Sequence, residues 1–351
     1  MKYKLVLENG QEFVGLNFGN DQEQIGELFF HTSMVGYQDL LSDPMYYGKI
    51  ACMTYPLIGN YGLADDDYDF KNIFIKGYVV KDNNDLPSNF RSTRTLSEAM
   101  EENHVSGLQD VDTRQISKII RDNGIMKAMI AKIDKPLEEC LKEINEYEVN
   151  ENPTELVSCK KVWYSRTANP SHTIVIVDLG IKTSLVKKIS EYGLNTIVVP
   201  YNTTLEQIRK FKPNGIIISN GPANPNKLND VVALINSLKG KYPLLGLGLG
   251  STLISLAYGG KVSKMKHGHQ GANLPVRNVK NGKIEITSQS HFYAIESLEN
   301  TSLDVTHINV IDNDIEGFVD NKARVIGVQY LVIDTLSDDE NVIKRFIKNM
   351  K

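Results

Sequence analysis

The second half of the chain alternates short apolar runs with amphipathic segments, and this alternation restricts the fold more than any other feature. From Thr173 onward, runs typical of buried strands and runs with helical spacing follow one another in the order TIVIVD, SLVKKISEYG, TIVVP, TTLEQIRKF, GIIIS, DVVALINSL and PLLGL. Such alternation predicts an open, mainly parallel α/β sheet with helices on both faces. Thr203 and Glu206 have the spacing of a capping box at the start of the second helix. We expect ligands to bind beyond the carboxyl ends of the strands.

The first half of the chain has no such regularity and indicates a separate, mixed β/α domain. Two period-2 runs flank Asn9-Gly10, a pair that tolerates positive φ, and they predict a hairpin. The run TRQISKIIRDNG has helical spacing, and Gly124 is expected to end that helix.

Length and local composition predict where the domains meet. A chain of 351 residues favours about two domains. Residues 146–171 contain Pro153, Pro170 and several asparagines, which is typical of a linker. We therefore predict a first domain at 1–145, a linker at 146–171, and an α/β domain at 172–351 that ends in added strands and a closing helix.

Composition excludes several classes of function. The chain is 41% hydrophobic and 23% charged, with a net charge of −4, which is typical of an ordinary globular protein. Nucleic-acid and membrane partners are not expected, because no basic stripe and no apolar run of about 20 residues is present. The N-terminal run MKYKLVLENG alternates like a strand and lacks a signal-peptide core, so we expect a cytoplasmic protein. Cys52, Cys140 and Cys159 are widely spaced, which favours reduced structural thiols over disulfides or a metal cluster.

The stretch PLLGLGLGSTLISLAYGG predicts a strand, a tight turn at Gly248 and a helix, and three chemistries use such a turn. Dinucleotide binding is disfavoured because Ser251 replaces the last glycine of the fingerprint and the expected later acidic residue is missing. A serine hydrolase is disfavoured because Ser251 lies past the tip of the turn, where a hydroxyl usually faces solvent or caps the helix. The third chemistry is that of a class I glutamine amidotransferase.

Motifs along nearly the whole chain support the third interpretation. They are, in chain order, HTSMVGYQDLLSDP, TYPLIGNYG, SNFRS, DVDTR, VDLGIK, SNGPANP, GLGLGSTLISLAYGGKVSKMKHGHQGANLPV, ITSQSHFYAI and VQY. Together they resemble the small, glutamine amidotransferase subunit of carbamoyl-phosphate synthetases. The resemblance implies an N-terminal domain that docks on a large subunit, followed by a class I glutamine amidotransferase-like domain. Any ATP, Mg and bicarbonate would belong to the large subunit, and no cofactor is expected in this chain.

The resemblance fails at the catalytic positions. The family hydrolyses glutamine with a cysteine assisted by a histidine and a glutamate. The cysteine matches Gly248, the histidine matches Leu331 and the glutamate matches Ile333. We therefore predict that this domain is catalytically inactive and that the chain belongs to a natural form that has lost glutamine hydrolysis.

The glutamine pocket that the resemblance implies is altered as well, so glutamine binding is not expected. Two of its positions match the family, Gly221 and Leu249, and six differ: Met45, Ala223, Thr252, Ser290, Phe292 and Tyr293. Phe292 stands where the family has a glycine, and we expect its ring to fill much of the pocket.

No other side chain is expected to replace the missing catalytic groups. Cys52 is expected in a core strand, and His291 has no nucleophile to serve. His267 and His269 suggest a metal, but no carboxylate or cysteine partner is evident, so no metal site is predicted.

Three functions follow from these expectations. The first is a structural or regulatory small subunit whose large partner uses free ammonia to make carbamoyl phosphate for arginine or pyrimidine synthesis. The second is a free-standing binding or regulatory module that holds a small anion at the remodelled turn. The third is the same family assignment with some residual glutamine hydrolysis.

Overall fold

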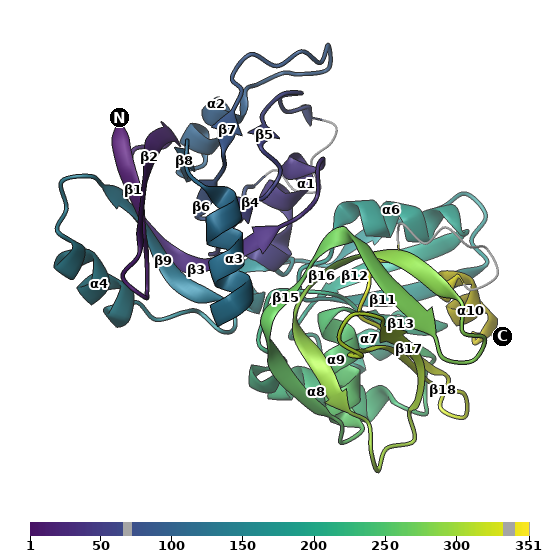
Figure 1. Ribbon diagram of the computed structural model, residues 1–351. Coiled ribbons are helices and arrows are strands. Elements are labelled where there is room, and N and C mark those ends of the chain that lie inside the picture. Colours follow the sequence, from purple (N-terminus) through teal and green to yellow (C-terminus); the bar gives the residue numbers. More distant parts are fainter. Residues whose placement is uncertain (66–71, 333–340, 351) are drawn as a thin grey trace. The chain divides into compact units, whose positions relative to one another are not determined.

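The computed structural model describes residues 1–65, 72–332 and 341–350. The chain forms two compact units, Met1–Asn150 (unit 1) and Glu151–Lys351 (unit 2). Figure 1 labels the strands β1–β9 of unit 1 and most of the strands of unit 2. Among the described residues, no helix is both long and apolar enough to span a membrane.

Unit 1 is built around a closed β-barrel. Its strands are, in hydrogen-bonded order, β1 (Lys2–Leu7), β2 (Glu12–Gly19), β8 (Ser106–Gln109), β6 (Gly77–Val79), β4 (Ile50–Met53), β3 (Gln24–His31) and β9 (Met126–Lys132). The predicted hairpin is confirmed: β1 and β2 are antiparallel, with Val6 opposite Glu12, and Gly10 has a φ of 85°.

Helices and a short accessory sheet complete unit 1. They are α1 (Tyr37–Ser42), the 3-10 helix η1 (Pro44–Tyr46), α2 (Leu96–Glu102), α3 (Thr113–Asn123), α4 (Leu137–Glu146), and the paired strands β5 (Leu57–Ile58) and β7 (Asp82–Asn83). The predicted stop of α3 is confirmed, because Gly124 follows it with a φ of 97°. Ile116 and Ile120 of α3 pack into the core of the barrel, which explains their helical spacing.

Unit 2 contains the predicted α/β sheet. Its strands are, in hydrogen-bonded order, β10 (Trp163–Ser165), β12 (Leu194–Pro200), β11 (His172–Asp178), β13 (Gly215–Ile218), β14 (Leu244–Leu247), β19 (Val325–Val328), β18 (Ile315–Asp320), β16 (Ile284–Ser297), β15 (Lys261–Asn278) and β17 (Asp304–Asn309). The segment from β12 to β19 is parallel, and the added strands are antiparallel. The open, mainly parallel sheet expected from the sequence is therefore confirmed.

Helices cover both faces of this sheet. They are α5 (Thr154–Val157), α6 (Thr183–Glu191), α7 (Leu205–Lys210), η3 (Pro225–Lys227), α8 (Asn229–Leu238), α9 (Leu249–Ala257) and α10 (Val342–Lys348). Val175 and Val177 of β11 face a core shared with α7, α8 and α9. Ile174 and Ile176 face a second core shared with α6 and α10. Because successive strand residues point to opposite faces, the apolar run TIVIVD supplies both cores.

The segment predicted as a linker carries regular structure. Residues 151–171 belong to unit 2. Trp163–Ser165 forms the edge strand β10, which pairs antiparallel with β12. The reason is that Trp163 packs against the apolar core beneath β12, which a composition-based argument does not register.

The capping box of α7 lies one residue later than the sequence suggested. Thr204 is the N-cap, and it exchanges hydrogen bonds with Gln207. The Thr203 hydroxyl donates instead to Pro200 O at 2.7 Å, which turns it away from the helix start. Two adjacent threonines offer the same motif, and tertiary packing selects between them.

Thr204→Ala is expected to lower the free energy of unfolding of unit 2 by about 1 kcal/mol, because a backbone N–H of α7 loses its acceptor. Glu206→Ala is the matched control and should change it by less than about 0.5 kcal/mol. Urea unfolding followed by the fluorescence of Trp163, the single tryptophan, measures both. Equal losses in the two variants would contradict the assignment of Thr204.

Candidate functional site

The Gly248 turn joins β14 to α9 at the carboxyl edge of the parallel sheet. Gly248 has φ 50° and ψ −113°, and its N–H donates to Val328 O at 2.8 Å. A Cβ placed on Gly248 would lie 3.1 Å from Asn220 Cβ. The strained strand-to-helix turn is thus present without a side chain at its tip.

A cavity of about 10 Å³ lies at this turn, and we name it the Gly248 cavity. The residues that line it are Lys182, Leu185, Asn220, Leu247, Gly248, Tyr330, Leu331 and Val332. A space of this size holds about one water molecule. None of these described lining residues carries a thiol, an imidazole or a carboxylate. The structure brings Gly248 and Leu331 together, whereas Ile333 lies outside the described residues.

The first turn of α9 buries its two hydroxyls. The Ser251 hydroxyl donates to Gly248 O at 2.7 Å and lies 2.9 Å from Gln329 Oε1, and the Thr252 hydroxyl donates to Leu249 O at 2.7 Å. The expectation that the Ser251 hydroxyl faces solvent or caps the helix is wrong, because the helix packs this side chain under Gln329. Gln329, which sequence analysis did not single out, also donates to Tyr293 O and so links α9 to β16.

Close packing determines the residue types in the glycine loop around Gly221, which lies beside the Gly248 turn. A Cβ on Gly221 would lie 2.1 Å from Leu179 O, so this position requires glycine whether or not a substrate binds. Ala223 and Leu249 are buried in the same apolar core. Asn220 Oδ1 is buried and has no hydrogen-bond partner among the described groups. A water in the Gly248 cavity would satisfy such an atom.

Phe292 lies in β16, next to Gly268 of β15. It is buried, and a Cβ placed on Gly268 would lie 2.8 Å from its ring, so the ring occupies the room that this glycine leaves. Phe292 is not among the described residues that line the Gly248 cavity. Tyr330, Leu331 and Val332 contribute walls of that cavity, and the filling of the glutamine pocket by Phe292 stays a prediction.

The remaining predicted pocket residues lie on other elements. Ser290 and Tyr293 belong to β16, where Ser290 pairs with Gln270 and Tyr293 pairs with Lys264 of β15. Met45 lies in η1 of unit 1, where it is buried and its N–H donates to Asp43 Oδ1.

A histidine–carboxylate cluster lies deeper in unit 2, formed by His269, His291, Asp312 and Glu316. His269 Nδ1 is 3.1 Å from Glu316 Oε1, and its Nε2 is 2.6 Å from Asp312 Oδ2. His291 Nε2 is 3.7 Å from Glu316 Oε1 and 3.1 Å from Gln289 Oε1. The structure thus gives His269 the carboxylate partners that the sequence did not reveal, and His291 rather than His267 shares them.

The charges of this cluster follow from its contacts. Burial alone would lower the pKa of His269, but hydrogen bonds to Asp312 and Glu316 raise it to about 9. Burial alone would raise the pKa of Glu316, but hydrogen bonds to His269 and His291 lower it to about 2. These shifts favour a protonated His269 between two carboxylates at neutral pH.

The same cluster has the composition of a metal site. Ligand atoms of His269, His291 and Glu316 lie within 4.8 Å of one another, as do those of His269, Asp312 and Asp314. These are residue types that bind zinc. Both ring nitrogens of His269 also lie within hydrogen-bond distance of carboxylate oxygens, so the same contacts suit an ion network. The absence of a metal site stays a prediction.

The cysteines are free thiols among the described residues. Cys52 lies in the fully buried strand β4 of unit 1, and burial raises its pKa. Burial likewise raises the pKa of Cys140, and that of Cys159 to about 12. None of the three has the lowered pKa that marks a reactive thiolate.

Comparison with known families defines the class of the chain. Residues 5–130 match the family model "Carbamoyl-phosphate synthase small chain, CPSase domain", and residues 175–330 match "Glutamine amidotransferase class-I". The barrel unit and the sheet unit each correspond to one of these families, in the order that the motifs predicted.

Curated relatives cover almost the whole chain. The pyrimidine-specific small chain of carbamoyl phosphate synthase from Bacillus subtilis is 42% identical, over 94% of this chain and 90% of its own length. The small chain from Fusobacterium nucleatum is 40% identical, over 99% and 98%. The chain belongs to the carbamoyl phosphate synthase small chain family, and membership implies a large subunit as its partner.

Proposed function

We propose that this small subunit has lost glutamine hydrolysis and acts as a structural and regulatory partner of a large subunit that uses free ammonia. One observation carries the proposal: the described residues that line the Gly248 cavity include no thiol, no imidazole and no carboxylate.

The chemistry of amide hydrolysis explains why this matters. A thiolate must attack the amide carbon, an imidazole must move protons, and a carboxylate must orient the imidazole. The backbone N–H groups at the start of α9 are retained. They cannot promote hydrolysis by themselves, because no oxyanion forms without a nucleophile to attack the amide carbon.

Several positions depart from the family pattern, which favours a natural loss of glutamine hydrolysis over a single substitution at the nucleophile. A change from cysteine to glycine would account for Gly248 alone, whereas Leu331, Thr252 and Ala223 also depart from the family pattern. Leu331 is partly buried and lies between Tyr330 and Val332 in the wall of the Gly248 cavity. An imidazole at this position would find no carboxylate among the described lining residues.

The rest of the proposal concerns the partner. We propose that unit 1 docks on the large subunit, which would bind the ATP, Mg and bicarbonate. Two relatives bear the name "pyrimidine-specific", and the carbamoyl phosphate made with this chain would serve pyrimidine or arginine synthesis in the cytoplasm.

The nitrogen donor of the reconstituted complex tests the proposal. With its own large subunit, ammonium should support carbamoyl phosphate formation, and glutamine at equal concentration should not. The control is a family small chain that carries cysteine, histidine and glutamate at the positions of Gly248, Leu331 and Ile333. With this control, both ammonium and glutamine should support carbamoyl phosphate formation. Incorporation of ¹⁵N from the glutamine amide through this chain would refute the loss of hydrolysis. Failure to bind the large subunit would instead favour a free-standing module.

A further inference from the structure

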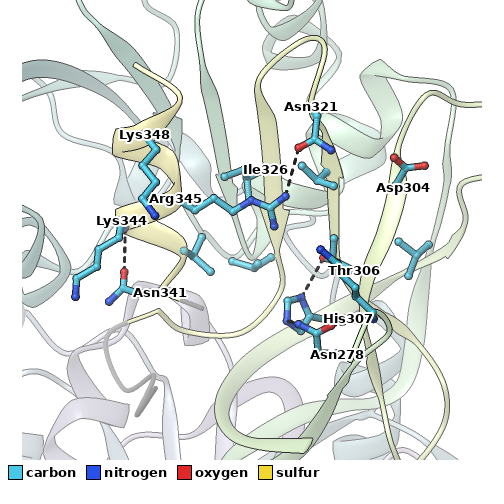
Figure 2. Close-up of a pocket in the computed structure, with 15 residues that line it drawn as sticks. Asn278, Asp304, Thr306, His307, Asn321, Ile326, Asn341, Lys344, Arg345 and Lys348 are labelled. Carbon is cyan, nitrogen blue, oxygen red and sulfur yellow. Dashed lines mark hydrogen bonds between the residues drawn. The ribbon is translucent and has the colours of Figure 1, made fainter. Parts of the chain in front are cut away.

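A second, much larger cavity lies in unit 2, away from the Gly248 turn. It has a volume of about 660 Å³ and is enclosed by α10, β17, β19 and the end of β15 (Figure 2). We name it the basic cavity. Its floor is apolar and buried, formed by Val319, Ile326, Val328 and Val342. None of these residues lines the Gly248 cavity.

The rim of the basic cavity concentrates positive charge. Lys280, Lys344, Arg345 and Lys348 line it together with one carboxylate, Asp304. The whole chain has a net charge of −4, so this excess is local. Three of the four cations come from α10, where Lys344 and Lys348 lie one turn apart.

Three of these cations, Lys280, Arg345 and Lys348, form no salt bridge within the part of the chain that the structure describes. The Arg345 guanidinium donates only a long hydrogen bond, 3.4 Å, to Asn321 Oδ1, which Figure 2 shows at the edge of the cavity. Their side chains are exposed at the rim, where an incoming anion can reach them.

Hydrogen-bonding side chains also line the basic cavity. His307 is buried; its Nδ1 is 3.0 Å from Thr306 Oγ1, and its Nε2 is 3.5 Å from Asn278 Nδ2. Its ring packs edge-on against Tyr330, with centroids 5.7 Å apart. Contacts on several sides therefore fix this ring in the wall. Asp304 adds an acceptor suited to hydroxyl groups.

We propose that the basic cavity binds a small organic phosphate. A phosphate dianion would offset the repulsion among Lys280, Arg345 and Lys348, since lysine and arginine are the residues that proteins use for phosphates. The apolar floor suits a flat or aliphatic group attached to the phosphate. Small-molecule sites have volumes of about 300–1,000 Å³, and this cavity falls within that range. This proposal does not depend on the loss of glutamine hydrolysis.

Titration calorimetry on the full chain tests the proposal with three probes: adenosine 5′-monophosphate, inorganic phosphate and adenosine. Adenosine 5′-monophosphate should bind with a stoichiometry of one, and at least tenfold more tightly than adenosine, because the phosphate supplies the charge. Inorganic phosphate should bind more weakly than adenosine 5′-monophosphate, because it leaves the apolar floor unused. Higher salt should weaken binding.

Charge reversal localises the site. Lys280→Glu/Lys348→Glu should weaken binding of adenosine 5′-monophosphate at least tenfold. The matched control is Lys187→Glu/Lys261→Glu, which makes the same change in net charge at exposed positions of unit 2 and should leave binding within twofold. Three outcomes would overturn the proposal: no heat from any probe at millimolar concentration, equal binding of adenosine and its phosphate, or equal losses in the two double variants.

Discussion

Cysteine placed at position 248 will not restore glutamine hydrolysis. Gly248→Cys returns one of three required groups, while Leu331 stays at the imidazole position and Ile333 at the carboxylate position. In a serine protease, losing either the serine or the histidine costs about as much as losing the whole triad, roughly 10⁶-fold in rate. Because the groups act as a unit, glutamate release by Gly248→Cys should match that of Gly248→Ala. A tenfold excess in the cysteine variant would contradict our assignment.

The same variants will be less stable than the natural chain. A side chain at the positive φ of Gly248 is strained, and its Cβ would lie 3.1 Å from Asn220 Cβ, so we expect a loss of about 1–3 kcal/mol. Gly240→Ala is the matched control, because Gly240 has a φ of 75° with open space around it. Urea unfolding of Gly240→Ala gives the cost of the backbone alone. A loss at position 248 no larger than at position 240 would exclude a contribution from Asn220.

The α/β sheet is well predicted from the sequence, because each of its parallel strands can be recognised from a few neighbouring residues. Each strand of the parallel segment is a short apolar run, and its burial on both faces is read directly from the letters, as in TIVIVD. The barrel of unit 1 was predicted only as mixed structure. Its closure depends on pairings such as β1 with β9 and β2 with β8, which join segments about a hundred residues apart. No periodicity reports such a pairing.

Part of the candidate site could also be predicted from the sequence, and part could not. The missing groups at Gly248 and Leu331 are matters of sequence, and the structure adds that the two positions share a cavity. Glu316 was missed because its partner His269 lies 47 residues earlier in the chain. The available signal was a single acidic residue inside the apolar strand IEGFVD, since a buried carboxylate requires a partner. The basic cavity was also missed, because its cations come from β15's end and from α10.

Removing the carboxylate of Glu316 will cost unit 2 more stability than any other change proposed for this chain. Glu316→Ala leaves the buried imidazolium of His269 with Asp312 as its remaining anionic partner. Breaking a buried ion pair by removing one member costs about 3–5 kcal/mol. The matched control is Glu299→Ala, at an exposed position of the same unit, which should change stability by less than about 0.5 kcal/mol. Urea unfolding followed by Trp163 fluorescence compares them.

The pH dependence separates this ion network from ordinary packing. The pKa of His269 is raised from 6.5 to about 9, so its contribution is complete below pH 6.5 and disappears as pH rises through 9. The pKa of Glu316 is lowered from 4.5 to about 2, so its contribution is complete above pH 4.5 and disappears as pH falls toward 2. The network is therefore fully charged between pH 4.5 and 6.5, and the natural chain should lose about 3 kcal/mol between pH 6.5 and 9.

Glu316→Ala should reduce the loss of stability between pH 6.5 and 9, because the pKa of His269 in the folded chain is then raised less. Glu299→Ala should keep the full loss. If both variants lose stability equally between pH 6.5 and 9, the pKa of His269 is not raised by Glu316, and the cluster acts through packing alone. A flat profile in the natural chain as well would mean that His269 is neutral when folded, and the ring would then have a lone pair free for a metal.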